Sequence, residues 1–454
     1  MNLSNLGPSA ACEGRGAGRR GLRLQIERWA ASDGAQAWLR RLVIVYVVAV
    51  FAIRIHHAGD FAGYLAVGEL VLRGENPYRG AGALNTWPPF FNVLCAPLAL
   101  LARPTPYLAR GVWFVLNFLC LWWILSSASR LVYGQRLVWT GDRQGMTLTS
   151  PWMFLPFLAT ERYVSSNFDH VQINLILFAL VLAGLRAQRR GFWGRGAAQI
   201  GAAAAIKVMP ITFIGYLAWR RRWRSAIATA VATAAFSLSP ALVFGWERYW
   251  EYVAAWRERI SAGWGVGRLN QSVWAMWDRW LGHGMVPILT PGAHDIPASG
   301  SPWVLPAVAA TAAVIVGVAW WRWRKGTPST WQCVAEWSFV FTATALFSPV
   351  TWKAYLAVLL LPNVLFFAAW WVAPPGSREA RIAAVGLWAT AATNALSPGL
   401  IGKNLAGRVE MGCLPTVLGL TVLVMLAWLQ PYLARLEAVA RRRLASPDEQ
   451  ASSQ

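Results

Sequence analysis

The chain has 454 residues, of which 56% are hydrophobic and only 14% are charged. A soluble domain carries roughly 25% charged residues, so this composition excludes an ordinary soluble enzyme and indicates a membrane protein. The net charge of +22 includes short arginine clusters between apolar runs, a pattern that favours contact with membrane lipids over binding of nucleic acid.

The two ends of the chain are polar and basic. Residues 1–41 predict a cytosolic tail that is partly disordered, and residues 434–454 predict a second cytosolic tail. Between them, residues 42–433 contain no visible internal repeat. The sequence therefore predicts one all-α polytopic membrane domain between two short tails.

The membrane domain contains apolar segments that predict transmembrane helices. Several are shorter than the ~20 residues that an upright helix needs, so their boundaries are approximate. The segments are about 42–56, 89–102, 111–128, 170–186, 225–245, 303–321, 332–349, 354–372, 382–399 and 412–430. Two further segments, 149–163 and 196–219, either span the membrane or re-enter it, so that about 10–12 helices are expected, some of them broken.

The charges between these segments predict which loops face outward. With the basic tail inside, the first loop, 57–88, is nearly neutral, and the loop 246–302 contains five acidic and five basic residues. Outer loops carry such a balance, whereas inner loops are rich in Lys and Arg. The basic clusters at 322–325, 378–381 and 435–443 then face inward, in agreement with this orientation.

The segment 196–219 has arginine clusters on both sides. A single crossing would carry one cluster across the membrane, so we predict a hairpin that turns near Lys207 and Pro210. Pro210 interrupts a helix, and Lys207 needs a polar cavity inside a membrane domain. Segment 149–163 would then also fold back; twelve plain spans is the alternative.

Asp60 precedes a helical segment in the first outer loop. Apolar residues at helical spacing predict an amphipathic helix over 61–73 that lies at the membrane surface. Asp60 stands where an N-cap would be, and such a cap stabilises a helix by about 1 kcal/mol. A carboxylate just beyond a first span also suits acid–base chemistry at the membrane surface. The two interpretations are compatible.

A second polar cluster contains Asn167, Asp169, His170, Gln172 and Asn174. We expect Asn167 or Asp169 to cap the apolar helix that follows. Gln172 and Asn174 lie inside the predicted start of that helix, where unpaired amides are costly to bury. They therefore predict a polar cavity or a polar ligand.

Two more polar clusters lie farther along the chain. They are Arg268-Leu269-Asn270-Gln271-Ser272 in the large outer loop, and Ser348-Pro349-Val350-Thr351-Trp352-Lys353-Ala354-Tyr355 between two apolar segments. The first is a possible helix cap. Lys353 in the second either extends to the membrane interface or neutralises a phosphate group.

Motifs for metal and nucleotide chemistry are absent from the sequence. It has no Asp-x-Asp pair, no GxxxxGK[ST] phosphate loop, no HExxH and no GxSxG, and its Cys and His residues lack metal-site spacing. The sequence predicts no metal site and no cofactor.

Taken in order, the motifs resemble those of glycosyltransferase family 87, membrane enzymes of the GT-C class that include polyprenyl-phosphate-mannose-dependent α-1,2-mannosyltransferases. The resemblance covers about residues 42–430. It rests on Asp60-Phe61 with Tyr64, Gly74-x-x-Pro77-Tyr78, Trp87-Pro88-Pro89 leading to Ala96-Pro97-Leu98, Gln172-x-Asn174, Ala205-x-Lys207-x-x-Pro210 with Arg222-Trp223-Arg224, Asn270-Gln271-Ser272, and Ser348-Pro349-x-x-Trp352-x-x-Tyr355.

Three positions depart from the family pattern. Val171 stands where the family usually has Gly, Trp87 where it often has Tyr, and Lys353 where an acidic residue or His is frequent. The expected fold is little affected by these departures, but they bear on the choice of donor and acceptor.

The resemblance implies a GT-C fold and transfer of a hexose, mannose in the named relatives of the family, from a polyprenyl-phosphate sugar. The acceptor is a lipid- or glycan-linked hydroxyl on the extracytoplasmic face of the bacterial cell membrane, and the transfer inverts the sugar. Asp60 is the implied general base. The leaving phosphate requires a cation, for which Lys353, Arg268 and Arg162 are the candidates.

The resemblance and the polar clusters together give a set of candidate substrate-binding residues. They are Tyr64, Asn76, Tyr78, Asp169, His170, Gln172, Asn174, Asn270, Gln271, Trp352 and Tyr355, with Lys207 as a possible buried polar residue. A transporter or flippase of lipid-linked saccharides is the alternative function. Such a protein should show repeat symmetry and charges near the membrane midplane, whereas the polar motifs here are predicted on one face.

Overall fold

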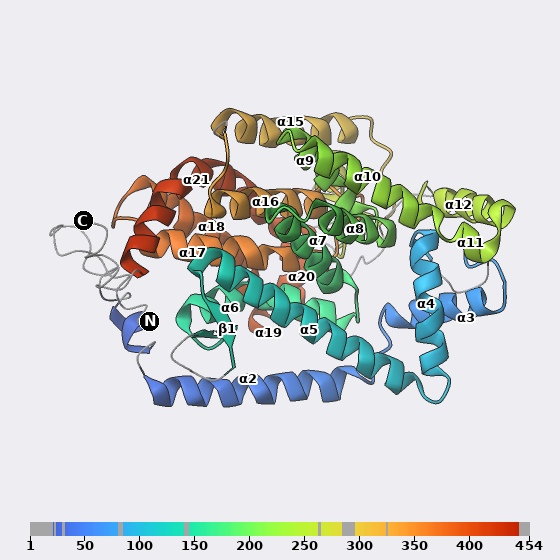
Figure 1. The fold of residues 1–454 in the computed structure, drawn as a ribbon, viewed down its shortest axis with the longest axis horizontal. Coiled ribbons are helices and arrows are strands. Elements are labelled where there is room, and N and C mark those ends of the chain that lie inside the picture. The colour runs from blue at the N-terminus through green and yellow to red at the C-terminus, as the bar shows by residue number, and fades with distance from the viewer. Residues whose placement is uncertain are drawn as a thin grey trace.

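The computed structural model describes residues 21, 24–29, 32–79, 85–139, 145–261, 265–283, 296–323 and 326–444. The predicted all-α fold is confirmed: these residues form a helical bundle (Figure 1) with one short parallel strand pair, β1 (Arg136–Val138) and β2 (Gly145–Thr147), that the sequence did not predict. Residues 1–20 and 445–454, which belong to the predicted tails, lie outside the described residues.

The described chain contains six helical units that are individually long and apolar enough to cross a membrane. They are α2 (Asp33–Arg54), α5 (Pro106–Tyr133), α10 with α11 (Trp223–Leu238 and Ala241–Phe244), α15 (Val304–Arg322), η4 with α17 (Lys353–Leu359 and Leu360–Val372) and α21 (Leu414–Leu444). A further span results if α6 (Pro151–Asp169) and α7 (Asn174–Arg189), which meet at a bend of 118°, are counted as one unit. The protein is thus a polytopic membrane protein, as predicted, but the described residues give six or seven such spans where about 10–12 were expected.

The remaining elements are shorter or less apolar. They are α3 (Phe61–Leu72), α4 (Pro89–Ala102), α8 (Trp193–Ile206), η2 (Met209–Ile211), α9 (Thr212–Trp219), α12 (Trp246–Ser261), α13 (Val273–Trp277), η3 (Asp278–Gly282), α16 (Thr330–Leu346), α18 (Arg378–Ala395), α19 (Pro398–Ile401) and α20 (Lys403–Met411). The domain boundaries drawn from composition, after residues 41 and 433, fall inside α2 and α21.

Local signals in the sequence explain where several helices begin. Thr105 accepts a hydrogen bond from the Tyr107 amide and is followed by Pro106, which suits the first helical position of α5. At α16, the side chains of Ser329 and Gln332 form a reciprocal capping box. A helix start leaves backbone amide groups without hydrogen-bond partners, and these caps supply them. The local sequence therefore determines where α5 and α16 begin.

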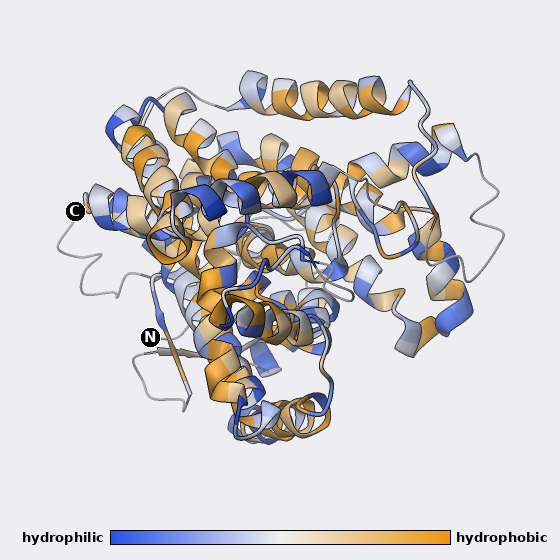
Figure 2. Cartoon of the chain, turned by 90° about the vertical axis from the view of Figure 1, so that its right-hand side faces the viewer, coloured by the Kyte–Doolittle hydropathy of each residue, from blue (hydrophilic) through white to orange (hydrophobic). Residues whose placement is uncertain are grey.

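Burial divides the helices into a core and a periphery. In the apolar stretch of η4 with α17, 89% of the residues are buried. In α2, which runs along one side of the bundle (Figure 1), only 6% of the apolar stretch is buried. Peripheral helices expose large apolar side chains, for example Val231 on α10 and Val314 on α15, each 63% exposed. Apolar residues dominate most helices along their length (Figure 2), and such exposed apolar surface suits a lipid surrounding.

The chain breaks where the hairpin was predicted to turn, since α8 ends at Ile206 and α9 begins at Thr212. At this break, the ammonium of Lys207 donates to Oδ1 of Asn174 at 3.1 Å. The arginines on either side both contact α16: Arg189 donates to Thr330 at 2.8 Å, and Arg220 pairs with Glu336. Both arginine clusters therefore lie toward the same end of the bundle.

The predicted outer loops meet one another in the structure. The indole of Trp256 in α12 donates to the carbonyl of Thr86 at 3.0 Å, and Arg259 donates to the carbonyl of Tyr78 at 3.1 Å. The backbone N–H of Gln271 donates to the carbonyl of Thr351 at 2.7 Å. Polar segments far apart in the sequence are thereby collected, and the candidate site is built from them.

Candidate active site

The break between α6 and α7 supplies part of the site. Asn167 and Asp169 belong to the end of α6, and α7 begins only at Asn174, so the prediction that Asn167 or Asp169 caps the following helix is wrong. Residues 170–173 form the turn, in which Val171 has a left-handed φ of 51°. This conformation is strained for a β-branched residue. The turn exposes backbone and amide groups that a straight helix would have used internally.

Asp60 has the position of an N-cap but does not cap. It precedes α3, yet its side chain makes no capping hydrogen bond to that helix, so the capping hypothesis is wrong. Instead, Oδ2 of Asp60 accepts a hydrogen bond from the amide of Gln172 at 2.8 Å. The backbone N–H of Asp60 donates to the carbonyl of His170 at 2.9 Å. Tertiary contacts with the α6–α7 turn, rather than the helix start, therefore orient this carboxylate.

Gly59 makes this contact with the turn possible. Its φ is +49°, and a Cβ at this position would lie 2.5 Å from the carbonyl oxygen of His170. Any other residue would be strained and would also push the two backbones apart. The absence of a side chain at Gly59 therefore permits the hydrogen bond between Asp60 and His170.

A chain of polar contacts continues from Asp60 into the bundle. Asn174 donates to Oε1 of Gln172 at 2.5 Å, and Lys207 donates to Asn174 at 3.1 Å. The ammonium of Lys207 also lies 3.6 Å from the centre of the Tyr355 ring, a cation–π contact. Four of the predicted site residues are thus joined to Asp60, and Lys207 has one polar and one aromatic neighbour among them.

The surroundings of Asp60 change its acidity. Partial burial raises the pKa of Asp60 above that of an ordinary aspartic acid, because the buried carboxylate is poorly solvated. His170, the Gln172 hydrogen bond and Lys207 oppose this increase in the pKa. Burial lowers the pKa of Lys207, and the nearby Asp60 carboxylate opposes that decrease. Carboxylate and ammonium are therefore electrostatically coupled.

The short helix η4 joins this network to a second one. Trp352 precedes η4, and its ring lies 6.0 Å from the imidazole of His170 in an edge-to-face arrangement. Tyr355 contacts Lys207, whereas Lys353 pairs with Glu410 at 2.9 Å. Lys353 is thus held by a buried carboxylate.

Glu410 binds all of the cations predicted to contact the donor phosphate. Oε1 accepts from Lys353 and from Arg162, and Oε2 accepts from Arg268 at 3.5 Å. The Glu410 side chain is fully buried. A second ion pair lies nearby, with Arg54 at the end of α2 bonded to Asp169 at 2.8 Å.

Other predicted residues build the framework of this region. Asn270 accepts from the amides of Ser272 and Thr351, and Gln271 donates to the carbonyls of Arg268 and Glu410. Ser272 caps α13 through a hydrogen bond from Ala275, which confirms the predicted cap in this cluster. Asn270 and Gln271 are buried and hold their loop beside the ion cluster.

The first loop uses its polar residues mainly for its own folding. Asn76 accepts from the amide of Tyr78 at 2.9 Å, and the hydroxyl of Tyr78 donates to the carbonyl of Trp87 at 2.7 Å. Tyr64 is buried within an aromatic group that includes Trp87 and Trp113. Tyr64 lies close enough to Asp60 to interact with its charge, whereas Tyr78 is directed toward Trp87 and the Tyr252 ring.

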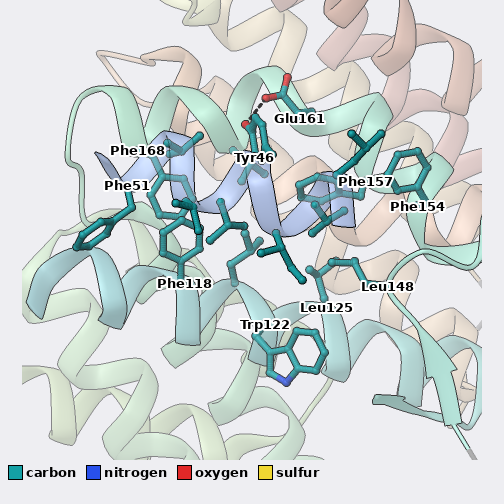
Figure 3. Close-up of a pocket in the computed structure, with 18 of the residues that line it drawn as sticks. Tyr46, Phe51, Phe118, Trp122, Leu125, Leu148, Phe154, Phe157, Glu161 and Phe168 are labelled. Carbon is teal, nitrogen blue, oxygen red and sulfur yellow. Dashed lines mark hydrogen bonds between the residues drawn. The ribbon is translucent and has the colours of Figure 1, made fainter. Parts of the chain in front are cut away.

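An apolar groove lies between α2, α5 and α6 (Figure 3). It has a volume of about 1050 Å³ and is lined almost entirely by apolar side chains. The hydrogen bond from Tyr46 to Glu161, at 2.6 Å, is a polar contact at its wall. The groove extends along α6 to Phe168, which immediately precedes Asp169 of the polar site.

Sequence reasoning missed Glu410 and the Arg54–Asp169 pair. Glu410 lies in a weakly apolar stretch between two predicted spans, where a lone carboxylate has no distinguishing neighbours. The one available signal was indirect: three predicted cations near a membrane need a compensating charge. Only the folded chain identifies which carboxylate provides it.

The fold and the site define a polytopic membrane protein with a coupled acid–base group and a cationic cluster at neighbouring positions. The sequence model of glycosyltransferase family 87 matches residues 85–349, more than half of the chain. This protein belongs to glycosyltransferase family 87. Asp60 lies before the matched residues and Glu410 after them.

Two curated relatives are similar to part of the chain. The polyprenol-phosphate-mannose-dependent alpha-(1-2)-phosphatidylinositol mannoside mannosyltransferase of Mycobacterium tuberculosis is 31% identical over 173 residues, which are 37% of this chain and 38% of that protein. The protein of the same name from Mycolicibacterium smegmatis is 29% identical over 184 residues, 38% of each chain. The matched part thus spans well under half of either relative. No solved structure matches the chain.

Proposed function

We propose that this protein transfers mannose from a polyprenyl-phosphate mannose donor to a hydroxyl group of a lipid- or glycan-linked acceptor. The reaction takes place on the extracytoplasmic face of the bacterial cell membrane and inverts the anomeric centre. Family membership and the printed names of the two relatives support the donor and the sugar. Family membership also favours a transferase over the alternative of a transporter.

The observation that carries the proposal is the orientation of Asp60. Its Oδ2 is held by Gln172, and in the described part of the chain no side chain hydrogen-bonds to Oδ1. Oδ1 is therefore left for the acceptor hydroxyl. A carboxylate with a raised pKa is a stronger base than an ordinary one, which suits proton removal.

The proposed step needs one base and one anion site. The acceptor oxygen attacks the anomeric carbon, its proton passes to Asp60, and the bond from that carbon to the phosphate oxygen breaks. The phosphate leaves with the electron pair of that bond, so no general acid is needed. Attack opposite to the leaving group inverts the configuration. Lys353 and Arg268, on the partly exposed side of the ion cluster, stabilise the departing phosphate.

The apolar groove supports a lipid-linked donor. It extends along α6 to Phe168, next to the Arg54–Asp169 pair, and its lining is compatible with an isoprenoid chain (Figure 3). We assign this groove to the polyprenyl chain of the donor. An apolar chain of this kind gains about 0.8 kcal/mol for each buried methylene group.

The distribution of arginines between the two ends of the helical bundle supports an extracytoplasmic site. Arg189 and Arg220 flank the hairpin and lie toward one end of the bundle, whereas Lys207 at its turn belongs to the Asp60 network. Arginine-rich ends tend to remain in the cytoplasm. The end that carries Asp60 is then on the other side of the membrane.

The decisive experiment is a transfer assay with purified protein, labelled polyprenyl-phosphate mannose and a panel of acceptors that includes phosphatidylinositol mannosides. We expect transfer by the unaltered protein and a loss of about 10²–10⁴-fold in Asp60→Asn, the usual contribution of a general base. Glu75→Gln, an exposed acid in the same loop, is the matched control and should retain activity. Full activity in Asp60→Asn would exclude Asp60 as the base.

A further inference from the structure

Glu410 is the meeting point of three cations from distant parts of the chain. Arg162 comes from α6, Arg268 from the segment before α13, and Lys353 from η4. The Glu410 side chain is 0% exposed, and its backbone carbonyl is fixed by the amide of Gln271 at 2.9 Å. Within the described chain, no other carboxylate pairs with three cations.

The three cations are not equivalent. The Arg162 side chain is 7% exposed and also donates to the carbonyls of Thr393 and Leu396, so it anchors Glu410 from the inside. The side chains of Lys353 and Arg268 are 18% and 23% exposed. Since they bind different oxygens of the same carboxylate, Glu410 holds these two cations side by side at the accessible edge of the cluster.

The cluster brings like charges close together. Lys353 and Arg268 both contact Glu410, so two positively charged groups lie on one carboxylate. The neighbouring carboxylate, Asp169, is paired with Arg54. Like charges at close range in a partly buried site repel each other, and a bound anion relieves that repulsion.

We propose that Glu410 is a positioning residue that holds Lys353 and Arg268 in place for the phosphate of the donor. The identity of the ligand rests on the proposed function, but the geometry applies to any polyprenyl phosphate. Glu410 offsets the repulsion between Lys353 and Arg268, and Arg162 compensates the charge of Glu410. The phosphate then meets two preorganised donors and does not have to bring them together, which lowers the free-energy cost of binding.

The test measures binding without turnover. The full-length protein in lipid nanodiscs is titrated with decaprenyl phosphate and, separately, with decaprenol, which lacks the phosphate. We expect Glu410→Gln to weaken binding of decaprenyl phosphate by about tenfold, the order of one charge-assisted hydrogen bond, and to leave binding of decaprenol unchanged. Glu410→Asp keeps the charge but is one methylene shorter, so an intermediate loss is expected. In turnover, KM for the donor should rise more than kcat falls.

Glu336→Gln is the matched control. Glu336 is also 0% exposed and pairs with an arginine, Arg220, but it lies on α16 and receives further hydrogen bonds from Tyr216 and Gln430. Both variants should lower thermal stability, and only Glu410→Gln should lower phosphate affinity. Equal losses of affinity in the two variants, or unchanged or tighter binding in Glu410→Gln, would overturn the proposal.

The outcomes also separate this inference from the proposed function. If the protein binds decaprenyl phosphate more tightly than decaprenol but transfers no mannose, the phosphate site is supported and the proposed function is excluded. If the unaltered protein transfers mannose and both Glu410 variants have an unchanged KM for the donor, the proposed function is supported and the role of Glu410 is excluded. If Glu410→Gln does not fold, Glu410→Asp and the paired titrations still decide the question.

Discussion

The side-chain amide of Gln172 donates a hydrogen bond at 2.8 Å to Oδ2 of Asp60, a residue 112 positions earlier in the chain. This contact takes the place of the helix cap that the sequence position of Asp60 suggests. It joins the first outer loop to the turn between α6 and α7, and through Asn174 it extends to Lys207. The reactivity that we propose for Asp60 therefore depends on side chains outside its own loop.

Removing the amide of Gln172 should reduce catalysis more than donor binding. Gln172→Leu keeps the volume of the side chain but removes its hydrogen bonds to Asp60 and Asn174. A hydrogen bond to a charged group contributes about 1.5–3 kcal/mol, so kcat should fall roughly 10–100-fold. Steady-state kinetics with labelled donor measure this effect.

Gln188→Leu controls for the loss of a buried glutamine. Gln188 is 7% exposed, against 3% for Gln172. It donates to Thr229 at 3.2 Å, in a different part of the bundle. Its kcat should match that of the unaltered protein. A comparable decrease in both variants would mean that the effect of Gln172→Leu comes from general destabilisation.

The activity should fall on the acid side at a higher pH than for an ordinary carboxylate. Asp60 acts as a base only when it is deprotonated, and burial raises its pKa. As the pH decreases through this raised pKa, the base is protonated and the rate is lost. A profile of kcat/KM against pH checks this expectation, because kcat/KM reports the ionisation of the free enzyme.

Lys207→Met should shift the acid limb of the pH profile, where activity falls as Asp60 is protonated, to still higher pH. The positive charge of Lys207 lowers the pKa of Asp60, so its removal raises that pKa. Lys403→Met, an exposed lysine on α20, should leave the profile in place. An acid limb that stays fixed or moves to lower pH in Lys207→Met would show that the two groups are not coupled as described.

Gly59→Ala should disrupt the site because of a specific clash. The new Cβ would lie 2.5 Å from the carbonyl oxygen of His170, in addition to the strain of a positive φ. We expect at least a tenfold loss of transfer, since a misplaced base loses the orientation on which catalysis depends. Gly134→Ala carries similar strain, at φ +72°, but has open space around its Cβ. It should retain transfer activity, and equal losses would leave strain alone as the explanation.

Filling the apolar groove should affect long donors selectively. Val115→Trp places an indole in the groove between α2, α5 and α6, so KM should rise several-fold for a long-chain polyprenyl-phosphate mannose. A short-chain donor that does not reach Val115 should be unaffected. Val231→Trp adds the same side chain on the exposed face of α10 and serves as the control. Equal effects on long and short donors would remove the groove assignment.

Hydrophobic periodicity and charge predicted the class of this protein and much of its helical layout. The segment predicted at 89–102 is helix α4, although its 14 residues make it shorter than the helices that can cross a membrane alone. The break predicted near Lys207 and Pro210 separates α8 from α9. These features depend on short stretches of sequence and on the cost of moving charge across a bilayer, so they can be read without knowledge of contacts. The same local logic failed at Asp60, because a cap and a tertiary contact compete for one carboxylate.

The α6–α7 turn illustrates a partial prediction. The polar residues from Asn167 to Asn174 were recognised as a cluster, but they were placed at the start of one helix, whereas the structure has a bend of 118° there. Val171 adopts a positive φ at the position where the resemblance led us to expect glycine. A β-branched residue gives no local signal of such a conformation, because packing around the turn imposes it.

The sequence by itself determined that this is an all-α membrane protein, which segments are apolar, and which polar residues are unusual enough to be candidates. Composition and periodicity act along the chain, and the bilayer enforces them residue by residue. Only the tertiary structure decided that Gln172 orients Asp60 and that Glu410 gathers Arg162, Arg268 and Lys353. Such contacts join segments that are far apart in the chain, and their free energy depends on distance and burial, which exist only after the chain has folded.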